Sequence, residues 1–305
     1  MKKYISILYI PLLFLFFACA QEDELTPSNI KENYFAPDEN ATDATSLLQK
    51  EFYKTEKSYL LFNDTLRHEP IGTKPNGEIQ YFTETVDIAY AMTGYSAYQY
   101  TYNYLSTIEQ KEEATQFIKD YILPHLSTKL RPFSWLLVNQ ILEYNIDYSP
   151  DIFLNDYKSV MVGKRCIAIA MENFVNLSES ELKEQTIPLF ISFLSNKMYV
   201  QPSETLKKFT QYGSSIYGAN TPVQPITEEE NMEYMKQAGF VEASVLWGFP
   251  FLGTYPSEKD DINAYIRLIL TKTDEEIGAE YANYPTIITK ANVIKSMILN
   301  LGYIY

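Results

Sequence analysis

The chain has 305 residues, of which 25 are basic and 39 acidic, so its formal net charge is -14 at pH 7. Such acidity argues against binding of nucleic acid and against electrostatic adhesion to anionic lipid, because both carry negative charge. Hydrophobic residues make up 46% of the sequence. This is ample for a core of ~200 or more residues, so we expect one large domain, or two closely packed lobes, rather than a string of modules.

A secretory signal opens the chain. Lys2 and Lys3 precede an apolar stretch over 5–17 that is too short for a comfortable membrane span. Ala18 then stands immediately before Cys19, an arrangement typical of a lipobox, in which the cysteine thiol is diacylated. We therefore predict a bacterial lipoprotein precursor anchored at Cys19, since two or three acyl chains hold a protein stably on a membrane. An uncleaved anchor or a plain secreted protein is the alternative.

The segment after the anchored cysteine is acidic at first and then polar. Residues 20–24 resemble the signal that sends lipoproteins to the outer face of the outer membrane in gut-type Gram-negative bacteria, with a merely solvated linker as the alternative. The chain up to about Thr45 has too little apolar surface to offset ordering, which predicts a flexible tether. The expected organisation is a signal peptide over 1–18, a lipid-anchored tether over 19–45 and a single domain over 46–305.

The numbers of cysteines and tyrosines bear on disulfide bonding and on the kind of binding surface. Lipidation of Cys19 leaves Cys166 alone, so the mature monomer has no intramolecular disulfide. Cys166 lies in an apolar run, which predicts a buried structural thiol rather than a nucleophile. Tyrosine is abundant, at 26 residues. Exposed tyrosines favour sugar-binding and protein-binding surfaces, although we expect most of them to be half-buried packing residues.

The first half of the domain mixes strands and helices. Apolar spacing of three and four residues predicts helices over 47–59 and 108–123, the second capped by Thr107. Apolar runs or alternation predict strands over 59–62, 98–104, 134–142 and 165–171. An Asn-Gly turn within 74–77 predicts a hairpin between its flanks.

The second half is mostly helical. Ser178 and Glu181 form a capping box that opens a helix over 179–197, and Pro188 should kink or split this helix. Three further helices are expected over 228–238, 260–271 and 289–301. The whole is an α+β pattern, with a small mixed sheet and a predominantly helical C-terminal half.

Four stretches carry a family resemblance: 59–66 (YLLFNDTL), 237–241 (QAGFV), 255–266, and the closing run from Thr289 that includes Lys290 and ends at 301–303 (LGY). They are similar to a family of outer-membrane lipoproteins described as substrate-import-associated zinc metallohydrolases, or zinc-binding metallopeptidases. The resemblance implies a zincin-like, metallopeptidase-like domain. It also implies a place beside TonB-dependent transporters and their glycan-binding partners.

The chain departs from that family at the metal site. The family's active site resembles a zincin, with two histidines one helical turn apart and a glutamate as general base. In the corresponding helix the ligand positions fall within 189–193, which holds apolar residues and Ser192. The family's downstream acidic motif resembles 260–264, where Asp260 and Asp261 survive. Upstream, Glu172 survives without a histidine.

The sequence also lacks the residues that other catalytic mechanisms require. His68 and His125 are the only histidines, and neither has a partner at ligand spacing, so we expect no zinc or other cofactor. The chain has no Gly-x-Ser-x-Gly nucleophile elbow. Asp260 and Asp261 are neighbours on a helix and face different ways, which favours a solvated helix N-terminus over an acid pair for sugar hydrolysis.

We therefore predict a catalytically inactive member of this family, lipid-anchored at the cell surface, that serves TonB-dependent nutrient uptake as an accessory or binding protein. Its ligand would be a peptide or glycan, bound either in the old cleft, with the candidate residues Ser192, Glu172, Asp260 and Asp261, or on a tyrosine-rich face. One alternative is an active peptidase or glycosidase built on these carboxylates, and another is a structural partner of a transporter with no ligand. A packed face near 189–193 would leave no pocket there. An open cleft lined by tyrosines and carboxylates would favour binding, and perturbed carboxylates converging on it would favour catalysis.

Overall fold

The computed structural model describes residues 33–89, 98–146, 153–175, 177–222, 224–225, 227–246, 249–250 and 252–305. The chain divides into two units, Met1–Tyr34 and Phe35–Tyr305. Nearly all of the first unit, including Cys19, lies outside the described residues, so the signal peptide and the lipid anchor stay predictions. Within the described ranges, no helix is both long and apolar enough to cross a lipid bilayer. The second unit is an α+β structure with small sheets.

Four strands form its central mixed sheet. In spatial order they are β1 (Tyr59–Leu61), β5 (Ser134–Val138), β9 (Cys166–Ala170) and β8 (Val160–Val162). The first three are parallel, and β8 is an antiparallel edge strand. Every residue of β5 and β9 is buried, as expected of continuous apolar runs in strands that are covered on both faces. The predicted small mixed sheet is confirmed.

A second sheet, which is antiparallel, is joined to the first through Asn139, which follows β5. Its strands are β4 (Tyr98–Asn103), β6 (Gln140–Asn145) and β7 (Phe153–Lys158). The single strand predicted over 134–142 is wrong, because the chain leaves the central sheet after Val138 and pairs with β4 from Gln140 onward. Polar Asn139 and Gln140 interrupt the apolar run at this point, so they were the available signal for the change of sheet.

The predicted hairpin is confirmed. Strands β2 (Thr65–Thr73) and β3 (Ile79–Thr85) pair antiparallel around the Asn-Gly turn. Gly77 has a φ of +87° there, which favours glycine over any residue with a Cβ. Nearly all residues of the hairpin are exposed or half-buried.

The fold begins earlier in the chain than expected. Asp43 caps helix α2 (Ala44–Glu56). Upstream of it, Phe35 is 5% exposed and packs edge-on against Phe133, with ring centroids 5.0 Å apart. The tether predicted over 19–45 therefore ends sooner, because an aromatic side chain within it belongs to the core.

Helix α3 (Ile108–Phe117) begins at the predicted cap Thr107, which forms a capping box with Gln110. It does not continue as a regular helix to its predicted end. A π-helical turn over Ile118–Ile122 and a 3-10 turn over Leu123–His125 follow it.

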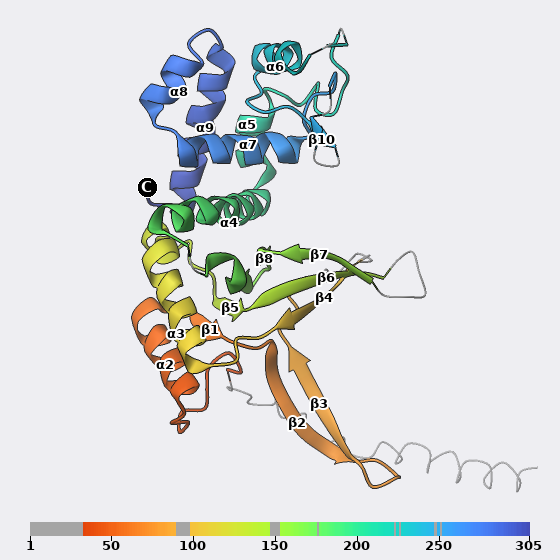
Figure 1. Ribbon diagram of the computed structural model, residues 1–305, viewed down its shortest axis with the longest axis vertical. Coiled ribbons are helices and arrows are strands. Elements are labelled where there is room, and N and C mark those ends of the chain that lie inside the picture. The colour runs from red at the N-terminus through yellow and green to blue at the C-terminus, as the bar shows by residue number, and fades with distance from the viewer. Residues whose placement is uncertain are drawn as a thin grey trace, which may run out of the picture. The chain divides into compact units, whose positions relative to one another are not determined.

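Helix α4 (Glu179–Tyr199) starts at the predicted capping box and continues through Pro188 as one helix rather than splitting there. Pro188 is exposed, so its ring faces solvent while the opposite face of the helix is held by packing. Helix α4 contacts β8 on one side and helices of the C-terminal half on the other, and Figure 1 shows it between them.

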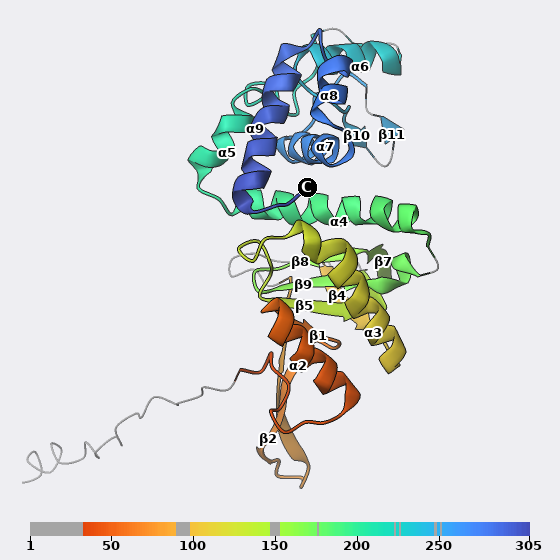
Figure 2. The same cartoon turned by 90° about the vertical axis from the view of Figure 1, so that its left-hand side faces the viewer.

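Among the described residues after α4, the chain forms five helices and a short two-stranded ladder. They are α5 (Ser203–Thr210), α6 (Glu228–Gln237), β10 (Val245–Leu246), β11 (Phe249–Pro250), α7 (Glu258–Thr271), α8 (Asp274–Glu280) and α9 (Pro285–Leu301). Helix α7 packs on both α4 and α9. Figure 2 shows α9 running beside α5 and α7.

Candidate functional site

The face of α4 where the resemblance would place zinc ligands is packed. Leu189, Phe190 and Phe193 are 3%, 3% and 1% exposed and belong to the main hydrophobic core. Ser192 is half-buried, and its backbone carbonyl accepts a hydrogen bond from the Ser195 hydroxyl at 3.3 Å. Apolar side chains therefore fill the positions at which a zincin would hold its metal.

The surviving carboxylates are not brought together. Glu172 is half-buried and accepts a hydrogen bond from the Gln140 amide at 2.5 Å. Asp260 is exposed at the start of α7 and accepts a hydrogen bond from the Ser257 hydroxyl at 2.6 Å, so its predicted role at a solvated helix N-terminus is confirmed. For Asp261 that prediction is wrong, because this residue is only 1% exposed.

Asp261 instead forms a buried ion pair. Its two carboxylate oxygens lie 2.9 and 2.8 Å from the ammonium nitrogen of Lys290, which is 0% exposed. The Tyr217 hydroxyl donates a further hydrogen bond to Asp261 at 2.7 Å. The Lys290 ammonium also donates to the backbone carbonyl of Gly239 at 2.7 Å. Both charged groups thus have polar partners, as buried charges require.

Three aromatic rings enclose the Lys290 ammonium. The nitrogen lies 4.9, 4.6 and 4.5 Å from the ring centroids of Phe209, Phe240 and Tyr265, within the range of cation–π attraction. Burial lowers the pKa of Lys290 and raises the pKa of Asp261, and in each case the charge of the partner opposes the shift. The pair therefore depends on its mutual attraction to stay ionised.

The three later stretches that carry the family resemblance meet in this cluster. Gly239 and Phe240 come from 237–241, Asp261 and Tyr265 from 255–266, and Lys290 from the closing run. No role for Lys290 was predicted from the sequence. Its position between apolar residues at helical spacing on α9 was the available signal for a buried lysine.

Neither histidine has a metal-binding environment. His68 lies on the hairpin, where its ring stacks on Tyr81 and its Nδ1 lies 2.8 Å from the Thr83 hydroxyl. The Nδ1 of His125 lies 2.9 Å from the Ile304 carbonyl, so His125 donates a hydrogen bond to it. In the part of the chain that the structure describes, no three His, Cys, Asp or Glu residues are grouped so as to hold a metal ion.

A groove of about 880 Å³ runs beside α4, and we call it the α4 groove. Its floor includes Ile187 and Phe190 of α4 and Tyr303 near the C-terminus. The His125 ring stacks on Tyr303, with centroids 5.7 Å apart, and meets Phe190 edge-on at 5.4 Å. Tyr121 also lines the groove.

The rim of the α4 groove is acidic. Asp120, Glu179 and Glu184 line it, together with Lys183. Lys183 is already paired with Glu179 at 2.7 Å, and this hydrogen bond lowers the pKa of Glu179. The rim therefore offers carboxylate oxygens as hydrogen-bond acceptors.

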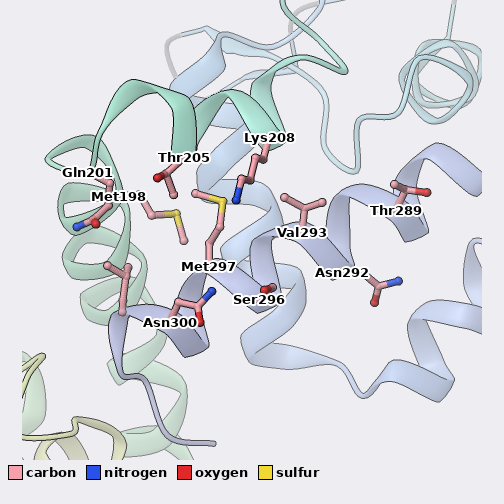
Figure 3. A pocket seen from close by; sticks show the side chains of 11 residues that line it. Met198, Gln201, Thr205, Lys208, Thr289, Asn292, Val293, Ser296, Met297 and Asn300 are labelled. Carbon is pink, nitrogen blue, oxygen red and sulfur yellow. The ribbon is translucent and has the colours of Figure 1, made fainter.

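A second cavity, of about 420 Å³, lies between the C-terminal end of α4, α5 and α9. Figure 3 shows Met198, Lys208 and Met297 around it. We call it the α5–α9 cavity. Neither this cavity nor the α4 groove is lined by any of the four predicted remnant-cleft residues Ser192, Glu172, Asp260 and Asp261.

Comparison of the chain with models of protein families, with curated proteins and with solved structures gave no match. The resemblance to the zinc metallohydrolase lipoproteins therefore stays a prediction that rests on the stretches quoted above.

Proposed function

We propose that this protein is a non-catalytic, metallopeptidase-like accessory protein with a zincin-like fold, anchored through Cys19 at the outer surface of the outer membrane. It binds a peptide or glycan in the α4 groove and serves TonB-dependent nutrient uptake. The observation that carries the proposal is the contrast between two faces of α4. The segment around Leu189 and Phe193 is packed, whereas the adjoining surface at Ile187 lines an open groove with tyrosines and carboxylates.

The groove suits a ligand that donates hydrogen bonds. The aromatic rings of Tyr121 and His125 offer flat apolar surface, which packs against sugar rings and apolar side chains alike. The carboxylates of Asp120 and Glu184 accept hydrogen bonds from hydroxyl or ammonium groups. A neutral glycan and a basic peptide both meet these requirements.

The arrangement of the carboxylates supports binding over hydrolysis. A glycosidase or peptidase needs acid and base groups that converge on one substrate. Glu172, Asp260 and Asp261 have separate hydrogen-bond partners, and Asp261 is committed to Lys290. On the groove rim, the lowered pKa of Glu179 makes it a poor proton donor near neutral pH.

The binding claim is tested by isothermal titration of the full chain with neutral oligosaccharides and with basic peptides. For the ligand that binds, Tyr121→Ala should weaken affinity about fivefold or more. The control Tyr212→Ala removes a tyrosine that is 38% exposed outside the groove, and it should leave affinity unchanged. Glu184→Gln should weaken the binding of a basic peptide much more than the binding of a neutral glycan, because the glutamine amide keeps a hydrogen-bond acceptor but carries no charge. Failure of both ligand sets to bind would overturn the binding proposal and favour a purely structural partner.

The non-catalytic claim is tested by elemental analysis of the purified protein, with a thermal shift in added zinc and in chelator. A metal-free protein that is indifferent to both supports the proposal. Stoichiometric zinc whose removal lowers the melting temperature would overturn it in favour of the active-hydrolase alternative.

The anchor is tested separately through Cys19. The variant Cys19→Ser should remove the acyl chains and release the protein from the membrane fraction, because the acyl chains supply the membrane affinity. Retention of Cys19→Ser in that fraction would contradict the predicted lipid anchor.

A further inference from the structure

The α5–α9 cavity has the form of a small-molecule site. Its volume of about 420 Å³ falls within the usual range of roughly 300–1,000 Å³ for such sites. Met198, Val293, Met297 and Leu301 give it an apolar floor. Methionine side chains are flexible and polarisable, so such a floor adapts to apolar groups of different shape.

The charge of the cavity is opposite to that of the protein. The chain carries 39 acidic residues against 25 basic ones, yet none of the cavity's lining residues is an aspartate or glutamate. Lys208 is the charged residue in the lining. Lys129 adds a second positive charge close by, because its ammonium donates to the carbonyl of Asn300, itself a lining residue, at 3.1 Å.

Lys208 differs from its neighbour on α5 in having no acidic partner. The ammonium of Lys207 lies 2.8 Å from the Glu204 carboxylate. For Lys208, no ion pair or side-chain hydrogen bond is present among the residues that the structure describes. In Figure 3 its side chain reaches from α5 toward Met297 of α9. An unpaired ammonium above an apolar floor favours an anion with an apolar body.

Three amide side chains also line the cavity. Gln201, Asn292 and Asn300 line the cavity from α9 and from the chain between α4 and α5. Their NH₂ groups are hydrogen-bond donors that can supplement an ammonium at a carboxylate. Gln201 already donates one of its two amide hydrogens to the Lys197 carbonyl, at 3.2 Å.

We propose that the α5–α9 cavity binds a small organic carboxylate, with the carboxylate against Lys208 and an apolar body on Met198 and Met297. This site is separate from the α4 groove, and the proposal does not depend on the function assigned to that groove.

The test follows the methyl signals of ¹³C-labelled methionine in the full chain, purified in detergent. The probes are benzoate, its neutral analogue benzamide and its cationic analogue benzylamine. The signals of Met198 and Met297 are assigned with the variants Met198→Leu and Met297→Leu. Benzoate should shift both signals, benzamide should bind about fivefold more weakly, and benzylamine should leave both signals in place.

Two matched lysine variants test whether the positive charge of Lys208 contributes to benzoate binding. Lys208→Gln should weaken benzoate binding about fivefold, whereas Lys207→Gln should not change it. Tyr121→Ala, in the α4 groove, should also leave benzoate binding unchanged. The proposal is overturned if benzoate shifts neither methionine signal, if benzamide binds as tightly as benzoate, or if Lys208→Gln binds benzoate as tightly as the parent chain. It is likewise overturned if benzylamine binds in preference to benzoate.

Discussion

The ammonium of Lys290 contacts both carboxylate oxygens of Asp261 in a site from which solvent is excluded. The two residues lie on α9 and α7, so their bond fixes how these helices pack. The attraction between buried charges is largely offset by the loss of their hydration, which makes a buried pair a weak source of net stability. Loss of one partner is a different matter, because it leaves the other charge buried without compensation.

The variant Lys290→Met should therefore lower the free energy of unfolding by about 3 kcal/mol or more. Denaturant unfolding, followed by circular dichroism, measures this change. Lys207→Met is the matched control, because it breaks an ion pair whose side chains are 65% and 79% exposed, and such pairs contribute at most about 1 kcal/mol. Equal losses in the two variants would show that Asp261 does not rely on Lys290.

Alkylation of Cys166 should require unfolding. Burial in β9 leaves this residue 2% exposed and raises the pKa of its thiol to about 12, so the reactive thiolate is scarce near neutral pH. We expect iodoacetamide to leave Cys166 unmodified in the native protein and to modify it fully in denaturant, as measured by peptide mass spectrometry. Rapid alkylation under native conditions would contradict the buried structural thiol.

Stability should fall as the pH rises above about 10. Partial burial, reinforced by hydrogen bonds to carboxylates, raises the pKa of Tyr100 and of Tyr104 to about 12. A group whose pKa is raised in the folded state contributes stability that is present below its unfolded pKa and is lost as the pH rises toward its folded value. Denaturant unfolding across this alkaline range should show the loss. Tyr100→Phe should reduce the slope, and a slope unchanged by this substitution would contradict the assignment of Tyr100.

Truncation within α4 should distinguish packing from a remnant site. Phe193 is 1% exposed, so Phe193→Ala should lower the free energy of unfolding by about 3 kcal/mol or more through loss of buried contacts and the resulting cavity. Ser192→Ala, at the half-buried neighbour, should change it by less than about 1 kcal/mol. Thermal and denaturant unfolding measure both variants. A Phe193→Ala protein as stable as Ser192→Ala would mean that this face of α4 is not packed.

The sequence predicted local features well because their causes are local. The Asn-Gly turn predicted the hairpin, and the cap at Thr107 and the capping box at Ser178 predicted the starts of α3 and α4. The short helices α5 and α8 were not predicted, because helices of eight and seven residues offer few apolar repeats. The capping box of Thr273 and Glu276 was an available signal for α8.

The site was less predictable, because it depends on which distant residues meet. Asp260 and Asp261 are adjacent and chemically identical, yet one is exposed and the other buried. Asp261 comes four positions before Tyr265, so helical periodicity places both on the inward face of α7. The periodicity of α7 does not show that a lysine of another helix lies against Asp261. The α4 groove likewise combines Tyr121, Phe190 and Tyr303, which are far apart in the chain.

The closing residues of the chain are joined to its middle. Tyr303 forms an antiparallel bridge with Leu126, the Ile304 N–H donates to the His125 carbonyl, and the Gly302 carbonyl accepts from Ser127. The segment over 125–127 thus gains these partners only after residues 302–304 have been synthesised. Contacts of such long sequence separation slow folding. A chain truncated before Gly302 would expose Leu126, which is 1% exposed here, and we expect it to be more sensitive to proteases than the full chain.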